Sequence, residues 1–263
     1  MSKAIVVAWH RYTPFGKIYY EPLLDYFLQQ MEKYQDEYEK IYFLDSTWEI
    51  DFIKAIKKLR ATKFKIIKVD PSLRYYDAYK KVLPQVEEDL VLFMDNDMVV
   101  YKPNIIFKTF GLLSDPSKNI DVVSIYDTCG TYTTDKLNGK NKFCPYWFAT
   151  RKELLMKYLD VDWGPDMPEY ETLGKLTKKM LEDGIKPYEL EEDKTDKGKD
   201  LGYYHIRAGS TIAYLLASKH DTPEHQKQYW DYLKNQPKSE ILRHCKWYTF
   251  MGGDPQEIIS DLK

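Results

Sequence analysis

Two carboxylates one residue apart follow an apolar run in the stretch DLVLFMDNDMVVYKP, residues 89–103. Asp95 and Asp97 thus end an expected buried strand, where ionised groups are costly unless something pairs with them. Their oxygens suit a hard divalent cation, Mg²⁺ or Mn²⁺, which usually completes its shell with phosphate and water. The alternative is a turn in which acidic side chains bond the backbone. The preceding apolar run favours the cation, which could neutralise a diphosphate leaving group.

Strand-like runs alternate with helical patterns through the first hundred residues. The expected strands are residues 4–10, 40–47, 63–70 and 90–97, and the expected helices are residues 19–38, 49–61 and 72–86. This alternation predicts an α/β fold with right-handed crossovers and a mainly parallel central sheet flanked by helices.

Four strand ends carry residues that could bind a ligand. His10, Asp45 and Asp70 end the first three expected strands, and the Asp95/Asp97 pair ends the fourth. Ligands of parallel sheets collect at the carboxyl ends of the strands, so these residues are expected at one edge. The alternatives are turn caps for Asp45 and Asp70 and a buried histidine for His10.

The second half of the sequence is less regular. We expect a strand at 121–127, a strand running into a helix over 143–159, a helix at 168–184, a strand at 185–192, a charged surface loop at 191–202, an ordered segment at 203–217 and a terminal helix at 223–236. Pro168 would lie in the first turn of its helix and Gly184 at its C-terminal cap. Tyr146 and Trp147 could form an acceptor platform, with core packing as the alternative.

Composition narrows the class of protein. The chain has 263 residues, 43% hydrophobic and 30% charged, and a net charge of −2, which is typical of a globular protein and gives no indication of nucleic-acid binding. Three cysteines without paired spacing argue against a disulfide scaffold and a structural zinc site, and favour a cytoplasmic setting. We expect no signal peptide and no membrane span. The basic and aromatic segment 241–251 leaves peripheral contact at the inner membrane face open.

Over roughly residues 4–215 the chain resembles the GT-A fold glycosyltransferases that use nucleotide sugars. The resemblance is carried by the order of elements, by FMDNDMVVYKP (93–103) as the DxD strand, and by a late histidine in YYHIRAGS (203–210). It implies one GT-A-like domain over 1–263, made of a nucleotide-sugar-binding half (1–103), an acceptor-side half (104–218) and a C-terminal helical extension (219–263). It also implies metal-dependent transfer of a hexose from a UDP- or GDP-sugar to a hydroxyl of a glycan, lipid-linked or small-molecule acceptor.

The resemblance also implies roles for individual residues. The implied nucleotide-sugar contacts are His10, Tyr12, Asp45, Arg74, Asp77, Asp95 and Asn96. The implied ligands of Mn²⁺ or Mg²⁺ are Asp97, Asp95 and His205, and a neutral imidazole suits such a cation. In this resemblance the charged loop 191–202 matches a lid that excludes water.

Transfer with inversion needs a carboxylate that deprotonates the acceptor hydroxyl. The stretch DWGPDMPEYETLG, residues 162–174, occupies the matching place, with Glu171 as the first candidate and Asp166 as the second. Inversion is favoured over retention, but the family's adjacent Glu-Asp pair is missing, so both the base and the stereochemistry stay open. The alternative is that acidic residues in a first helical turn only interact with the helix dipole.

Two other classes of function remain. The motif FMDNDMVV also fits haloacid-dehalogenase-type phosphatases, in which Asp95 would be a nucleophile, although that motif normally follows the first strand. An inactive sugar- or nucleotide-binding module would keep the fold without the reaction. A sugar nucleotidyltransferase would need a glycine-rich loop after the first strand, where this chain has only Gly16.

Overall fold

The computed structural model describes residues 1–9, 27–45, 63–70, 72–96, 98–100, 102, 104–125, 143–144, 146–165, 173–185, 187–190 and 203–205. These ranges contain most of the expected strands. The expected helices at 49–61 and 223–236 and the loop at 191–202 lie outside them.

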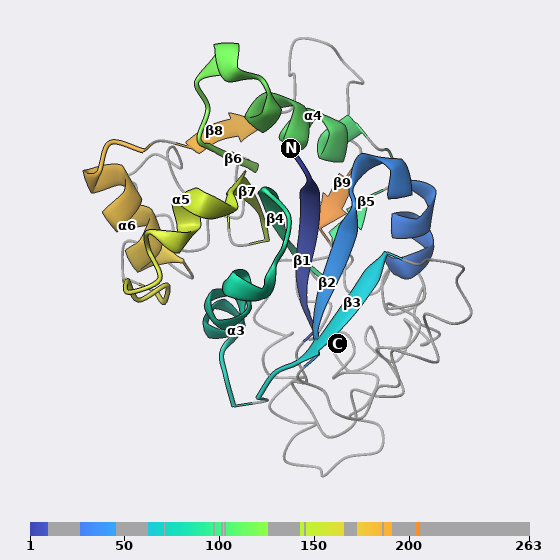
Figure 1. Ribbon diagram of the computed structural model, residues 1–263, viewed down its shortest axis with the longest axis horizontal. Helices are drawn as coiled ribbons and strands as arrows, with labels where there is room; N and C mark the ends of the chain where they lie inside the picture. The colour runs from blue at the N-terminus through green and yellow to red at the C-terminus, as the bar shows by residue number, and fades with distance from the viewer. Residues whose placement is uncertain are drawn as a thin grey trace, which may run out of the picture.

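Four parallel strands form the first half of the main sheet (Figure 1): β1 (Lys3–Trp9), β2 (Lys40–Asp45), β3 (Phe64–Lys68) and β4 (Leu90–Asp95). β1 lies between β2 and β4, and all three pairings of these strands are parallel. The sequence prediction of four parallel strands is therefore confirmed.

Three further strands complete the sheet: β6 (Val122–Ile125), β7 (Trp147–Arg151) and β8 (Pro187–Leu190). The strand order is β3-β2-β1-β4-β7-β6-β8, and β7 is antiparallel to both of its neighbours. β8 runs parallel to β6. In the described part of the chain the sheet has seven strands and is mainly parallel, which confirms the prediction of a mainly parallel sheet.

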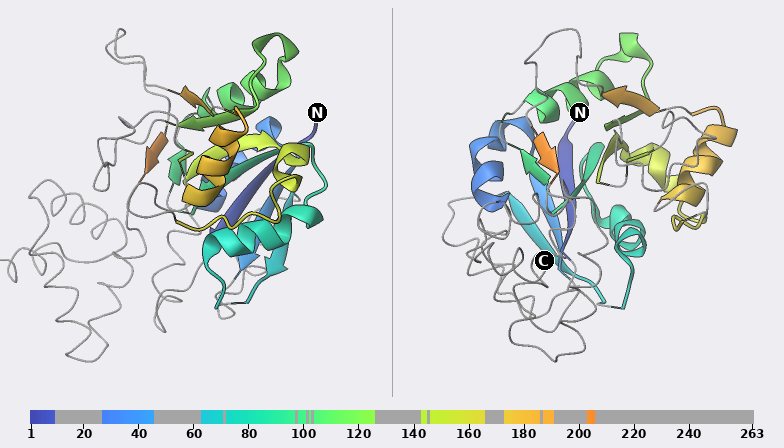
Figure 2. Two further views of the ribbon diagram at one scale, coloured as in Figure 1. Left: turned by 90° about the vertical axis from the view of Figure 1, so that its left-hand side faces the viewer. Right: turned by 180° about the vertical axis from the view of Figure 1, so that it is seen from behind.

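Helices cover both faces of the sheet (Figures 1 and 2). A helical segment at 27–33 and α4 (Asn104–Ser114) pack on one face, and α3 (Tyr75–Val82), α5 (Lys152–Met156) and α6 (Gly174–Glu182) pack on the other. Three short 3-10 helices accompany them: η1 (Gln35–Glu37), η2 (Leu83–Gln85) and η3 (Pro116–Lys118).

Alternation along the strands explains the two-sided core. In β4, Leu92 and Met94 pack on the face of α4, whereas Val91 and Phe93 pack on the face of α3. Successive residues of a strand point to opposite faces, so a strand buried on both sides is apolar throughout. Each fully buried large side chain of this kind contributes about 1.5–3 kcal/mol.

The predicted helix at 168–184 begins later than its sequence pattern indicates. Leu173 has a left-handed backbone, with φ of 60°, and α6 starts at Gly174. An L-residue in that conformation does not continue a right-handed helix, so the prediction of a first turn near Pro168 is wrong. The predicted C-terminal cap is confirmed, because Gly184 has φ of 82° directly after the helix.

A second, small sheet lies beside the main one. β5 (Met98–Val100) and β9 (Tyr203–His205) pair antiparallel, with Met98 opposite His205 and Val100 opposite Tyr203 (Figure 1). β5 follows β4 after a turn at Asn96, so the chain leaves the main sheet directly after Asp95.

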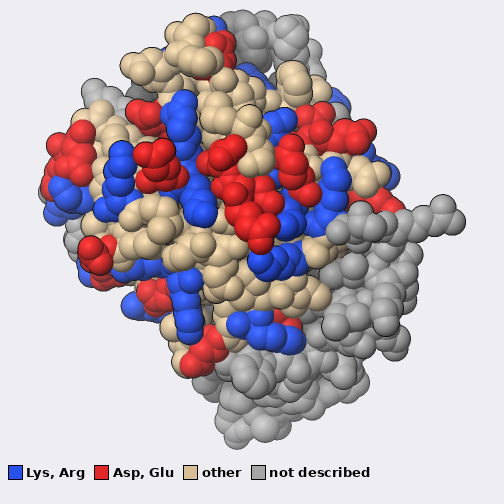
Figure 3. Space-filling model, in the orientation of Figure 1, with Lys and Arg blue, Asp and Glu red and all other residues tan. Residues whose placement is uncertain are grey.

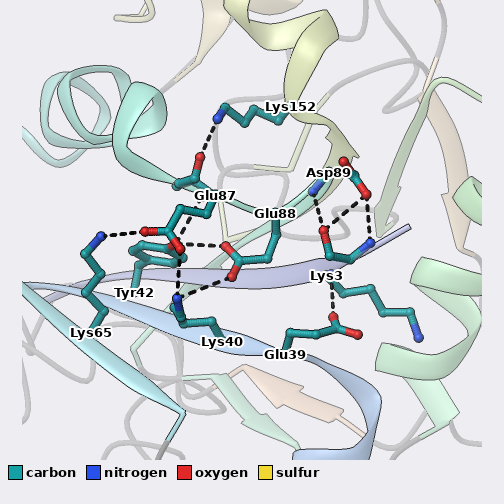
Figure 4. A network of polar contacts seen from close by, with 11 residues as sticks. Lys3, Glu39, Lys40, Tyr42, Lys65, Glu87, Glu88, Asp89 and Lys152 are labelled. Atoms are coloured by element: carbon teal, nitrogen blue, oxygen red, sulfur yellow. Dashed lines mark hydrogen bonds and ion pairs between the residues drawn. The ribbon is translucent and has the colours of Figure 1, made fainter.

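A network of polar contacts connects residues at the amino ends of the strands (Figure 4). The Tyr42 hydroxyl donates to the buried Glu88 carboxylate over 2.8 Å and accepts from the Glu87 amide over 3.0 Å. Lys40 lies 3.2 Å from Glu87 and 3.8 Å from Glu88. Burial, together with the Glu88 carboxylate, raises the pKa of Tyr42 well above its usual range, so the phenol remains a neutral donor.

The described surface carries charges of both signs. On the face shown in Figure 3, basic and acidic side chains alternate across the described surface rather than forming areas of one sign. In the described ranges, no helix combines the length and the apolar character needed to cross a membrane.

We predict that Tyr42→Phe lowers the free energy of unfolding by about 1–3 kcal/mol, because a buried carboxylate and an amide both lose a partner. Urea denaturation monitored by circular dichroism measures this change. Tyr188→Phe is the matched control, since Tyr188 is exposed on β8, and its effect should stay within about 0.5 kcal/mol. Equal effects of the two substitutions would contradict a structural role for the network.

Candidate active site

The carboxyl ends of four parallel strands are aligned at one edge of the sheet. Asp45 is the register partner of Trp9 and of Lys68, and Asp95 is the partner of Ala8. The backbone therefore places the ends of β1 to β4 side by side, as the sequence predicted. His10 and Tyr12 lie outside the described residues, so their predicted roles remain predictions.

The first DxD carboxylate closes β4. Asp95 is half-buried, and its amide donates to the Tyr146 carbonyl over 3.2 Å. Asn96 follows in a turn and is also half-buried. Asp97 lies outside the described residues. The strand end is thus fixed by β1 on one side and by the chain entering β7 on the other.

Pairing of β5 with β9 brings the late histidine to the DxD motif. His205 is the Cα partner of Met98, which directly follows Asp97 in sequence. The backbones of the two predicted metal-binding segments therefore meet, although they are far apart along the chain. The side chain of His205, like all of Asp97, lies outside the part of the molecule that is described.

This arrangement fits a divalent cation. Asp95 at the end of β4, Asp97 between β4 and β5 in sequence and His205 on β9 would supply oxygen and nitrogen ligands of suitable type. Among the described side chains, no group of three His, Cys, Asp or Glu could hold a metal ion. The predicted set of Asp95, Asp97 and His205 stays a prediction, because Asp97 and the side chain of His205 lie outside the described residues.

Asp45 carries a contact that sequence reasoning missed. Its carboxylate is completely buried and pairs with the Lys68 amine, whose side chain is 55% exposed. Lys68 ends β3 in direct register with Asp45. A lysine at the end of the neighbouring strand was the available signal, but its use requires knowing the register. In this structure the exposed group of the pair, and the one that a ligand could contact, is the Lys68 amine.

Asp70 caps a local turn. Its carboxylate accepts from the Ser72 hydroxyl over 2.7 Å and from the Ser72 amide over 2.9 Å. These hydrogen bonds hold the pKa of Asp70 below its ordinary value. The turn-capping interpretation is confirmed for this residue.

Arg74 and Asp77 pair with each other at the start of α3. The Arg74 Nε atom lies 3.2 Å from the Asp77 carboxylate, and its guanidinium carbon lies 4.7 Å from the centre of the Tyr76 ring. α3 begins near the carboxyl end of β3, so both residues lie at the edge where the strand ends are aligned. Arg74 is exposed, and its guanidinium has further N–H groups that could donate hydrogen bonds to a phosphate.

Both candidate bases lie in a segment whose ends are fixed together. Asp166 and Glu171 are outside the described residues, but the Lys175 amide donates to the Gly164 carbonyl over 3.0 Å, and the Lys175 amine lies 2.6 Å from Asp162. A Cβ atom at Gly164 would lie 3.4 Å from the Tyr76 ring, so this junction packs on the first turn of α3. The two ends of the segment, Gly164 and Lys175, therefore lie together near Tyr76.

The predicted aromatic platform belongs to the core. Trp147 is fully buried, and its indole nitrogen donates to the Thr109 hydroxyl over 3.2 Å. Tyr146 is also buried in the same apolar cluster. Core packing, the alternative expected from sequence, is confirmed for both residues.

We predict a strong coupling between Asp45 and Lys68 in a double-mutant cycle. Lys68→Met should lower the free energy of unfolding by about 1–3 kcal/mol, because a buried carboxylate loses its charged partner. In the double variant with Asp45→Asn, the change in the free energy of unfolding should differ from the sum of the two single changes by about 0.5–3 kcal/mol. Urea denaturation measures all three changes.

The matched control for this cycle is the exposed pair of Lys179, on α6, and Asp183, the residue that caps the C-terminus of α6; their charged atoms are 2.6 Å apart. Lys179→Met and Asp183→Asn should couple by no more than about 0.5 kcal/mol. Additive costs at Asp45 and Lys68 would show that the buried pair is not a real interaction.

Comparisons with known proteins concern the fold. No family model and no curated protein matches the sequence. A mannosyltransferase from Pyrobaculum calidifontis, in complex with GDP-Man and Mn²⁺, is 12% identical with a TM-score of 0.54, covering 98% of this chain and 74% of its own. Glucosyl-3-phosphoglycerate synthase from Mycobacterium tuberculosis, in complex with Mn²⁺ and UDP-glucose, is 17% identical with a TM-score of 0.51, covering 72% and 69%.

Solved structures of other enzymes match as well. The 4-diphosphocytidyl-2C-methyl-D-erythritol synthase from Anaerococcus prevotii is 13% identical with a TM-score of 0.49, covering 72% of this chain and 87% of its own. The two glycosyltransferase matches establish the fold class, a GT-A-like α/β fold with helices on both faces of a mainly parallel sheet.

Proposed function

We propose that the protein is a metal-dependent glycosyltransferase that moves a hexose from a UDP- or GDP-sugar to a hydroxyl of an acceptor. The observation that carries the proposal is the register of β5 with β9, which sets His205 opposite the residue that follows Asp97. The GT-A-like fold supports it, since structures of this fold include sugar transferases solved with nucleotide sugars and Mn²⁺.

The metal ligands in this proposal are Asp97, Asp95 and His205. A bound Mn²⁺ or Mg²⁺ would supply charge neutralisation to the diphosphate leaving group. Asp95 and Asn96 would in addition contact hydroxyls of the ribose or the sugar. The half-burial of both residues at the end of β4 supports this role, because it leaves part of each side chain accessible.

The nucleoside side of the site would be formed by His10, Tyr12, Asp45, Arg74 and Asp77. Alignment of the ends of β1, β2 and β4 supports this grouping for Asp45. The mutual pairing of Arg74 and Asp77 at the start of α3 supports it for those two, because it fixes the direction of the exposed guanidinium.

The acceptor would be deprotonated by Glu171, or by Asp166, with inversion at the sugar carbon. Because α6 starts at Gly174 after a left-handed Leu173, Glu171 lies outside the first turn of that helix. An acidic residue outside the first turn does not gain the favourable interaction with the helix dipole, so this alternative does not explain Glu171. The fixed junction of Gly164 and Lys175 beside α3 supports a position for this segment near the donor edge.

The phosphatase hypothesis gains no specific support. β4 is the fourth strand of the chain, whereas the phosphatase motif normally follows the first, and the register that brings His205 to Met98 has no role in a reaction at an Asp95 nucleophile. The acceptor class, cytoplasmic location and contact at the inner membrane face remain parts of the proposal that only assays with candidate acceptors and cell fractionation address.

We predict that GDP-mannose or UDP-glucose binds only with Mn²⁺ or Mg²⁺ present, as measured by titration calorimetry with and without a chelator. Asp97→Asn and His205→Gln should each weaken the metal-dependent binding by about 100-fold, since even changes to the partners of metal ligands cost about 10–100-fold. Asp70→Asn is the matched control, because this carboxylate lies at the same edge but bonds Ser72 locally.

Binding indifferent to the chelator, or the absence of any nucleotide-sugar binding, would contradict the proposal. Hydrolysis of a phosphate ester through a covalent aspartyl-phosphate at Asp95 would favour the phosphatase instead.

We predict that Glu171→Gln lowers the rate of transfer by about 10²–10⁴-fold while leaving the dissociation constant of the donor unchanged, because a general base acts only on the acceptor. The measurement compares kcat with donor affinity for Glu171→Gln and Asp166→Asn. The configuration of the product, read by NMR, reports inversion. A retained sugar configuration with full activity in both variants would refute a carboxylate base in this segment.

A further inference from the structure

The small sheet that carries His205 needs support from outside itself. β5 and β9 have three residues each, and a two-stranded ribbon of this size is not stable in water on its own. Yet the proposed metal site requires that His205 stay opposite Met98. The contact that fixes β9 on the main body of the protein therefore decides whether the histidine is in place.

Tyr203, the first residue of β9, makes such a contact. Its ring stacks on the indole of Trp147, with ring centres 6.4 Å apart and planes at 24°. Tyr203 is half-buried and packs against the core cluster that also contains Met98 and Val100. An aromatic stack of this kind contributes about 0.5–1.5 kcal/mol beyond the buried area.

Trp147 offers a rigid surface for that stack. Its backbone is paired with Met94 of β4, the residue before Asp95, and its indole nitrogen is held by Thr109 of α4. The side chain is fully buried. One residue therefore connects the end of the DxD strand to the ring that holds β9.

The stack also selects the register of the ribbon. With Tyr203 opposite Val100, His205 falls opposite Met98. A slip by one residue would exchange the two faces of a strand and give His205 a different partner. A pairing of three residues has few hydrogen bonds that oppose such a slip. We therefore expect the aromatic contact to contribute much of the preference for the observed register.

We propose that Tyr203 is a positioning residue for the metal site: its ring, stacked on Trp147, sets the register of β9 on β5 and thereby holds His205 beside the DxD motif. This inference rests on the proposed function, because it assumes that His205 is a metal ligand. Tyr203 acts through β9 and Trp147 rather than on the reacting groups. The aromatic ring is the part of the side chain that the inference uses.

The experiment measures Mn²⁺ affinity in the presence of GDP or UDP, from the free-ion signal in electron paramagnetic resonance. Tyr203→Ala should weaken Mn²⁺ binding by about 10–100-fold, as do changes to residues that orient metal ligands. Tyr203→Phe and Tyr203→Trp keep a ring and should stay within about twofold of the wild type. Hydrogen exchange at Met98 and His205 should accelerate in Tyr203→Ala alone among these variants.

Phe64→Ala is the matched control for general destabilisation. Phe64 is also half-buried against the same core cluster and stacks on Phe43 with ring centres 5.5 Å apart and planes at 29°, but it lies on β3. It should lose stability comparably and keep its Mn²⁺ affinity. Tyr203→Leu, which keeps apolar bulk without a ring, serves if Tyr203→Ala does not fold, and it should also weaken Mn²⁺ binding.

The outcomes separate the two proposals. Wild-type Mn²⁺ affinity in Tyr203→Ala, or in Tyr203→Leu if that variant replaces it, overturns the positioning role and leaves the proposed function intact. An equal loss in Phe64→Ala also overturns it, because the effect would then follow from stability alone. No Mn²⁺ binding by the wild-type protein with either nucleotide overturns the proposed function and this inference with it.

Discussion

The pairing of β5 with β9 is the contact on which the candidate site depends. Asp95 is fixed by the main sheet, but His205 reaches the same region only because a three-residue strand from late in the chain returns to pair with the segment after the DxD motif. The proposed cation would add to this closure, since it would link the two segments by bonds stronger than the ribbon's own hydrogen bonds. Metal binding and closure of the small sheet are then expected to be coupled.

The two edges of the main sheet handle their charges differently. At the amino edge, Glu87 and Glu88 pair with lysines, and Glu88 also accepts a hydrogen bond from the Tyr42 hydroxyl, so the charged groups have partners within the protein (Figure 4). At the carboxyl edge, Asp45 is paired by Lys68, and β4 ends at Asp95, where the chain leaves the main sheet. The contacts of the amino edge thus stabilise the fold, and under the proposed function the carboxyl edge would bind the charged ligand.

Local patterns predicted the fold because alternation and helical spacing depend on neighbours in sequence. The apolar run before Asp95 predicted β4, and Asp70 at a strand end left open the turn cap that the structure shows. The start of α6 was missed because the left-handed backbone of Leu173 has no signal in a side chain that favours helices. Lys68 and Tyr203 were missed for another reason: their partners, Asp45 and Trp147, are set by register and packing between distant segments. His205 was found only through the resemblance to a family, which supplies such long-range information.

The most direct test of the central claim is a measurement of the nitrogen coupled to bound Mn²⁺. Electron spin echo envelope modulation of the protein with Mn²⁺ and GDP or UDP would show whether a histidine nitrogen is a ligand. We predict modulation from one imidazole nitrogen in the wild-type protein, and its loss in His205→Gln at Mn²⁺ concentrations that still fill the site. Modulation that persists unchanged in His205→Gln, or its absence in the wild type, would contradict the convergence of His205 and the DxD motif on one cation.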